Sequence, residues 1–258
     1  VLGLGWGVEG VAIATLVAEW TGLGVGLWLC REGFRGNQWR DWPRVFDAAR
    51  LQRMLQVNAD IMVRSVVLTV SFTTFLFLAA DLGDVTLAAN QVLLQFLEIT
   101  AFALDGVAFA AEALVAAVGA GARGRVRRAA LMTSEWGVGG ALGLCAAFWL
   151  GGPWLIDLMT TSADVRAEAR QFLFWAALAP ALGIASWMLD GIYFGATWTR
   201  ELRIAMLQSV AVYVAALFML VPWLGNHGLW AALMVLNVSR GLTLGLRYPG
   251  LERRVGAG

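Results

Sequence analysis

Three carboxylates, spaced seven residues apart within the apolar stretch 90–120, are the residues best placed to do chemistry. Glu98, Asp105 and Glu112 share one face of a helix, because two heptads shift a straight helix by only about 40°. A stripe of acids facing lipid would be prohibitively costly, so this face must point into protein or into a water-filled cavity. Acids in such a place bind protons or contact cations.

Asp105 is the strongest single candidate for a protonatable or cation-contacting group. It lies near the middle of the predicted helix and precedes Gly106, where another backbone can approach closely. A fixed salt bridge to Arg64 is the alternative interpretation. Glu98 lies nearer the outer half of the helix, and Glu112 is interpreted as an interfacial group near a basic cluster.

Asp60 and Arg64 are four residues apart on one face of another apolar segment. Each charge, if isolated in the membrane, would cost several kcal/mol, so they are predicted to pair with each other or with the acids opposite. The pair is either a structural bridge between helices or a switch whose partners change during a transport cycle.

Other polar residues in apolar segments have weaker assignments. Four amides either line a cavity or bond between helices, and bonding between helices is favoured: Asn58, Asn90, Gln91 and Gln95. Asp190 and Arg200 flank a turn and are interpreted as a loop clamp. Glu135 and Arg240 need partners that the sequence does not identify.

The elements that position these residues are transmembrane helices. The 258-residue chain is 59% hydrophobic and 14% charged, whereas about a quarter of the residues of a soluble domain are charged. Seven apolar segments reach about 20 residues, enough to cross a hydrocarbon core of about 30 Å: 5–29, 54–80, 87–119, 126–150, 168–189, 202–220 and 228–248. The predicted fold is an all-α polytopic membrane protein in the lipid bilayer.

Several function classes find no support in the sequence. The net charge of +1 gives no field that would attract nucleic acid. Nucleotide-binding loops, catalytic triads and zinc-ligand spacings are absent, so neither an enzyme nor a metal site is predicted. Cys30 and Cys145 are interpreted as packing residues, and His227 is a poor metal-ligand candidate because no other ligand is near it in sequence.

Arginine placement predicts the topology, because loops rich in basic residues stay in the cytoplasm. Arg clusters follow the first, third, fifth and seventh segments, which places the C-terminus in the cytoplasm and the protein in the inner (plasma) membrane. The predicted division is a helix in 1–30, a basic cytoplasmic loop in 31–53 that includes a short surface helix, a six-helix lobe in 54–248 and a tail in 249–258.

An internal repeat would place this chain in a larger architecture. Aligned at an offset of 218, the first and last segments share Gly7 with Gly225, Gly10 with Gly228, and two further identities. If the first segment closes one repeat and the last closes another, a preceding lobe of the same protein, with about five more helices, is expected before Val1.

Three stretches resemble the multidrug and toxic compound extrusion (MATE) transporters, and more closely their DinF-like branch. They are QVNADIMVRS at 56–65, ANQVLLQF at 89–96 followed by FALDGVAFAAE at 102–112, and LDGIYFGATWTRELR at 189–203. The resemblance covers nearly the whole chain. It implies twelve helices in two six-helix lobes, of which this chain carries the second lobe and the preceding helix.

The resemblance also implies a secondary antiporter that exports small organic compounds, often cationic, in exchange for H⁺ or Na⁺, with no other cofactor. Its coupling carboxylates lie in the amino-terminal lobe in DinF-like members, and only Thr15 and Glu19 of that lobe's polar residues are present here. We therefore expect Asp105, Asp60 and Arg64 to form the charged floor of the second lobe. The alternatives are a flippase for lipid-linked saccharides and a non-transporting fragment or subunit.

Overall fold

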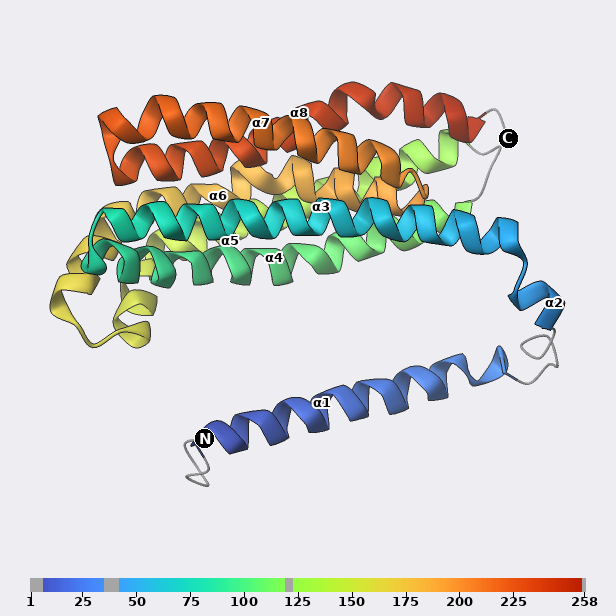
Figure 1. Ribbon diagram of the computed structural model, residues 1–258, viewed down its shortest axis with the longest axis horizontal. Coiled ribbons are helices and arrows are strands. Elements are labelled where there is room, and N and C mark those ends of the chain that lie inside the picture. The colour runs from blue at the N-terminus through green and yellow to red at the C-terminus, as the bar shows by residue number, and fades with distance from the viewer. Residues whose placement is uncertain (1–6, 35–41, 119–122, 257–258) are drawn as a thin grey trace. The chain divides into compact units, whose positions relative to one another are not determined.

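The structure, a computed structural model, describes residues 7–34, 42–118 and 123–256, and over these residues it is helical with no strand. The helices are α1 (Gly7–Leu29), a 3-10 turn η1 (Cys30–Glu32), α2 (Trp42–Val45), α3 (Ala48–Asp81), α4 (Asp84–Val118), α5 (Arg123–Met159), α6 (Ala163–Gly195), α7 (Thr199–Leu224) and α8 (Asn226–Gly256). Figure 1 shows α3 to α8 as a bundle of long helices.

Seven of the described helices are long and apolar enough to cross a membrane, which confirms the predicted fold class. Most extend beyond the predicted apolar segments. The longest, α5, has 37 residues, or about 55 Å at about 1.5 Å per residue, so its ends reach past a hydrocarbon core of about 30 Å. Apolar runs mark only the part of each helix inside lipid, which explains the shorter predictions.

The predicted short surface helix before the lobe is wrong. Residues 48–53 are instead the first turns of α3, and only the four residues of α2 form a separate helix. Asp47 starts α3, since its Oδ1 accepts hydrogen bonds from the backbone N–H of Ala49 at 3.0 Å and of Arg50 at 3.1 Å. Residues 35–41 of the predicted loop lie outside the described residues.

The chain falls into two units that divide between Leu55 and Gln56. The first contains α1, η1, α2 and the start of α3, and α1 has no buried side chain over its apolar span. The second contains the rest of α3 and all later helices, and it holds the hydrophobic core.

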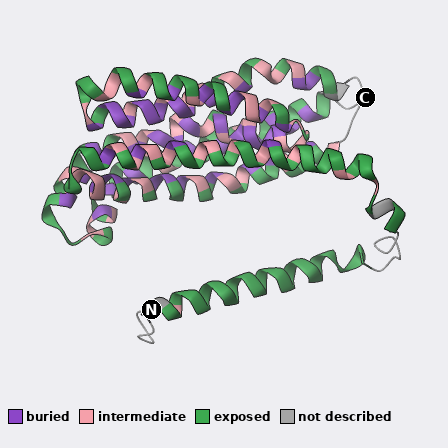
Figure 2. Ribbon diagram, viewed as in Figure 1, coloured by how far each residue is buried: buried purple, intermediate pink, exposed green. Residues whose placement is uncertain are grey.

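Helices α6 and α8 are the most buried of the second unit. Over an apolar stretch of 18 residues in each helix, 50% of the residues are buried in α6 and 56% in α8, compared with 11% in α3 (Figure 2). Phe75 of α3 packs edge-on against Trp230 of α8, with 5.2 Å between ring centroids. Polar side chains on α6 and α8 therefore have to find partners inside the protein.

Glycines let α4 and α6 approach closely. A Cβ built on Gly191 would lie 2.3 Å from the carbonyl oxygen of Ala108, and one built on Gly195 would lie 2.4 Å from that of Glu112. The spacing of four residues places both glycines on one face of α6. This contact holds the last third of α4 against the end of α6, next to Asp105 and Asp190 in the sequence.

A buried amide cluster joins α4 to α8. Asn90 is completely buried; its amide donates to Asn226 at 2.7 Å and its oxygen accepts from Trp230 Nε1 at 2.9 Å. Asn226 donates back to Asn90 at 3.1 Å. The favoured interpretation of Asn90, bonding between helices, is confirmed, and its assignment to a cavity is wrong.

We predict that Asn90→Leu lowers the free energy of unfolding by about 1–2 kcal/mol, because hydrogen bonds between membrane helices contribute about 0.6 kcal/mol on average and up to about 1.7. Unfolding of the purified protein in mixed micelles measures the change. Gln91→Leu is the matched control, since Gln91 is the exposed neighbour and should change stability by less than about 0.5 kcal/mol. Equal losses in both variants would contradict a role for the cluster.

Candidate functional site

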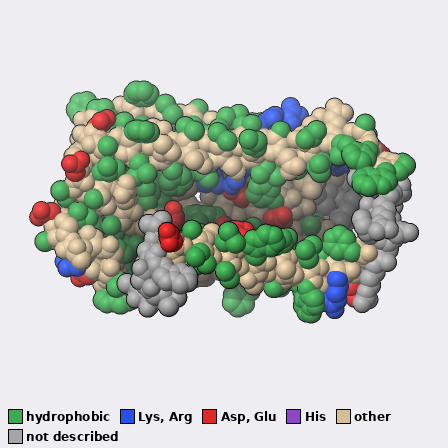
Figure 3. All heavy atoms as spheres, turned by 60° about the horizontal axis from the view of Figure 1, so that its bottom comes forward, with side chains coloured by type: hydrophobic (Ala, Val, Ile, Leu, Met, Phe, Trp, Pro, Cys, Tyr) green, Lys and Arg blue, Asp and Glu red, His purple; other side chains and the backbone are tan. Residues whose placement is uncertain are grey.

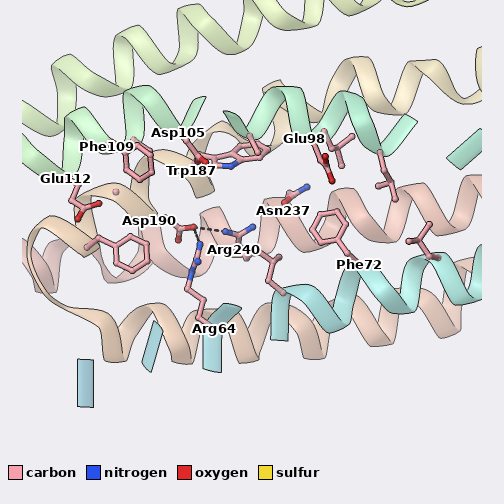
Figure 4. Close-up of a pocket in the computed structure, with 18 residues that line it drawn as sticks. Arg64, Phe72, Glu98, Asp105, Phe109, Glu112, Trp187, Asp190, Asn237 and Arg240 are labelled. Atoms are coloured by element: carbon pink, nitrogen blue, oxygen red, sulfur yellow. Dashed lines mark hydrogen bonds and ion pairs between the residues drawn. The ribbon is translucent and has the colours of Figure 1, made fainter. Parts of the chain in front are cut away.

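A cavity of about 490 Å³ lies between α3, α4, α6 and α8 (Figure 4). Its charged and amide lining is contributed by all four helices: Arg64, Glu98, Asp105, Glu112, Asp190, Asn237 and Arg240. The rest of the wall is apolar or aromatic. Figure 3 shows basic and acidic side chains among the hydrophobic ones of the bundle.

The centre of the cavity is an Arg–Asp–Arg cluster. The Oδ2 oxygen of Asp190 accepts a hydrogen bond from Arg64 of α3 and another, at 2.6 Å, from Arg240 of α8. The side chains are buried, with 14% of Arg64, 7% of Arg240 and 9% of Asp190 exposed. Charges so buried are tolerated only when paired, so Asp190 ties α3 and α8 to α6.

This cluster corrects two expectations. Asp190 is not a loop clamp but the acid at the centre of the cavity. It is also the partner of Arg240 that the sequence did not identify. Arg64 pairs with Asp190 and not with Asp60 or through a fixed salt bridge to Asp105. Arg64 also lies over the ring of Phe194, 5.4 Å from its centroid, which adds a cation–π contact.

All three acids of the heptad stripe line this cavity, which confirms that they share one face of α4. Glu112, which the sequence predicts to be an interfacial group, lines the same cavity as Asp105 (Figure 4). Within the described residues, Asp105 has no hydrogen bond or ion pair. Two guanidiniums thus face four carboxylates, and the cavity carries an excess of negative charge.

Aromatic rings form much of the remaining wall, and they include Phe72, Phe109, Trp187 and Phe194. Trp187 lies against Gly183 one turn earlier on α6, where a built Cβ would come within 2.2 Å of the indole ring. The glycine therefore lets the indole lie along the helix. Rings beside carboxylates suit a flat organic cation.

Other predicted site residues lie elsewhere. Asp60 is buried but pairs with Arg203 of α7 at 2.6 Å and accepts from the Thr199 hydroxyl at 3.2 Å, so its place in the charged floor is wrong. Asn58 and Gln95 are exposed and do not line the cavity. Both have the right residue type in the right segment, so residue type alone does not identify the cavity lining.

Asn237 and the central role of Asp190 could not be predicted from the sequence. One signal was present, since Asn237 and Arg240 are three residues apart and therefore share a face of α8. Among the described residues, no group of three or more His, Cys, Asp and Glu could hold a metal ion. Cys30 and Cys145 are both free thiols.

Comparison with known proteins identifies the family. The MatE family model matches residues 61–221, a span that contains α4, α5, α6 and most of α3 and α7. The chain belongs to the MatE family. Members of this family are transporters and not enzymes, and the family agrees with the predicted MATE resemblance.

Similar proteins support this assignment. The chain is 35% identical over 251 residues to DNA damage-inducible protein F of Escherichia coli (strain K12), covering 95% of this chain and 53% of that protein, in agreement with the DinF-like branch. It is 27% identical to Protein DETOXIFICATION 44, chloroplastic, of Arabidopsis thaliana, covering 92% of this chain and 45% of that protein. The chain thus spans about half the length of the curated relatives it matches.

A solved structure shows the same fold. The bent form of the Vibrio cholerae MATE transporter VcmN matches with a TM-score of 0.78 at 18% identity, covering 97% of this chain and 57% of that one. A MOP superfamily transporter from Pyrococcus furiosus matches with a TM-score of 0.55 at 16% identity, over 76% of this chain and 44% of that one. The helices of the second unit thus adopt a MATE transporter fold.

Proposed function

We propose that this chain forms the carboxy-terminal lobe, and the helix before it, of a MATE antiporter that exports organic cations in exchange for H⁺ or Na⁺. The observation that carries the proposal is the cavity in which four carboxylates face two arginines, both arginines being held by Asp190. An amino-terminal lobe of the same protein supplies the opposite wall. The protein lies in the inner membrane with its C-terminus in the cytoplasm.

Asp105 is the carboxylate proposed to exchange cargo for the coupling ion. It faces the cavity near Arg64, which attracts its negative charge, and near Asp190, which repels it, but it forms no ion pair with Arg64. A proton, a sodium ion or an organic cation would each compensate its charge. Because one carboxylate is compensated by one cation at a time, cargo and coupling ion compete for it.

The acid excess favours an antiporter for cations over a flippase for lipid-linked saccharides. A flippase binding a lipid diphosphate needs free cationic side chains in its cavity. Here Arg64 and Arg240 both donate to Asp190, and the cavity groups that face no ion partner are acids. A cavity with this charge repels a diphosphate and attracts an amine.

Asp105→Asn in the complete protein is expected to lower gradient-driven dye efflux by about tenfold or more, because a neutral amide neither takes up a proton nor attracts a cation. Proteoliposomes with H⁺ and Na⁺ gradients imposed separately measure the loss and identify the coupling ion. Glu135→Gln is the control, since Glu135 is exposed and outside the cavity, and should keep full efflux. Unchanged efflux and ion coupling in Asp105→Asn would rule out the proposed role of Asp105. If the parent protein itself shows no efflux, the result would favour a non-transporting subunit.

A further inference from the structure

Asn237 is a buried amide without a partner. It is only 4% exposed, it lines the cavity, and within the described residues its side chain makes no hydrogen bond. Figure 4 shows it between Arg240 and Phe72, on the side of the cavity away from Arg64. Since no buried side-chain nitrogen or oxygen of the described residues lacks a hydrogen-bond partner, the amide atoms of Asn237 are open to the cavity, where a bound molecule can reach them.

The surroundings of Asn237 differ from those of Asp190. Around Asp190 the polar atoms of Arg64 and Arg240 are bonded to the carboxylate. The cavity wall near Asn237 instead combines the carboxylate of Glu98 with the rings of Phe72 and Trp187. This part of the cavity offers hydrogen-bond acceptors that no described protein group uses, beside aromatic rings that line the wall.

We propose that Asn237 is a specificity-determining residue that, with Glu98, accepts hydrogen bonds from an aromatic amine on the exported compound. The carboxylate of Glu98 only accepts, and the oxygen of Asn237 is a second acceptor, so the pair matches a group rich in N–H donors. The ring that carries the amine packs against Phe72 and Trp187. This inference rests on the proposed export of organic cations and adds which cations are preferred.

The preference has a predictable size. A hydrogen bond between neutral groups contributes a factor of about three to ten in affinity, and one to a carboxylate contributes more. A compound with the same ring and charge but no amino groups leaves both acceptors without a partner. Ethidium, with two aromatic amines, should therefore bind at least about tenfold more tightly than 5-ethyl-6-phenylphenanthridinium, its analogue without them.

Calorimetric titration of the purified complete protein with these two dyes tests the inference. Asn237→Leu should weaken ethidium binding by about three- to tenfold and leave binding of the analogue unchanged, because only ethidium uses the amide. Asn237→Ser, which keeps a smaller polar group, should lie between the parent and Asn237→Leu. Gln95→Leu is the control, since Gln95 is an exposed amide on α4 outside the cavity, and should bind both dyes as the parent does.

Measuring stability distinguishes a role of Asn237 in binding the exported compound from a role in folding. Because Asn237 bonds no described residue, Asn237→Leu should unfold no more easily than the parent protein. Equal binding of the two dyes by the parent, or equal weakening of both dyes in Asn237→Leu, would overturn the inference and leave the proposed export intact. Failure of the parent to bind either dye would overturn the inference together with the proposed function.

Discussion

Asp190→Asn is expected to lower the free energy of unfolding by about 3–5 kcal/mol, the usual cost of breaking a buried ion pair by removing one charge. Asp190 is the shared partner of Arg64 and Arg240, and its neutralisation leaves two largely buried guanidiniums without the carboxylate that bonds both of them. Unfolding of the parent and variant in mixed micelles measures the difference.

The matched control is an aspartate that also bonds two arginines but lies at the surface. Asp157 pairs with Arg170 at 2.6 Å and with Arg166 at 3.5 Å, and 39% of its side chain is exposed. Asp157→Asn should therefore cost at most about 1 kcal/mol. In Asp190→Asn, adding Arg240→Gln should recover part of the stability, because one uncompensated charge is removed. An Asp190→Asn protein as stable as the parent would show that the cluster is not essential to the fold.

Gly191→Ala is expected to lower the free energy of unfolding by about 1–3 kcal/mol, although Ala is the better helix former. The added methyl carbon would lie 2.3 Å from the carbonyl oxygen of Ala108, which is backbone and cannot move aside without shifting the helix. Helices α4 and α6 must then separate at the level of Asp190 and Asp105. The same micelle unfolding measures the loss, and weaker dye binding would report the distorted cavity.

Gly106→Ala is expected to change stability in the opposite direction. Gly106 follows Asp105 in α4, and a Cβ built there meets nothing within 4 Å. The substitution should raise stability by about 0.5–1 kcal/mol, the usual gain on replacing glycine inside a helix. Similar effects of the two substitutions would contradict the close contact between α4 and α6.

Asp60 lies outside the cavity and pairs with residues of α7. Its bonds to Arg203 and Thr199 join the first half of α3 to the start of α7, outside the cavity. It shares an i, i+4 relation with Arg64, but the two side chains have different partners on different helices. Pairing along a helix is a weak constraint when each side chain also meets a charged neighbour across a helix interface.

Much of the fold follows directly from the sequence. Runs of about 20 apolar residues can only be helices in lipid, where each backbone N–H and C=O must bond within its own segment. The same reasoning puts Glu98, Asp105 and Glu112 on one face of α4, since their spacing of seven repeats nearly every two turns. The motifs at 56–65, 89–112 and 189–203 were specific enough to indicate the family.

The composition of the cavity was decided only by tertiary structure. Asp190, Arg64 and Arg240 are separated by up to 176 positions, and no local pattern relates them. Asn58, Gln95 and Asn237 are all amides in apolar segments. Of the three, only Asn237 lines the cavity, because the tertiary arrangement of the helices places its face of α8 there. Helical periodicity tells which residues share a face, but the rotation of each helix against its neighbours decides what that face meets. That rotation depends on contacts such as Gly191 with Ala108 and Phe75 with Trp230, which join residues far apart in the chain.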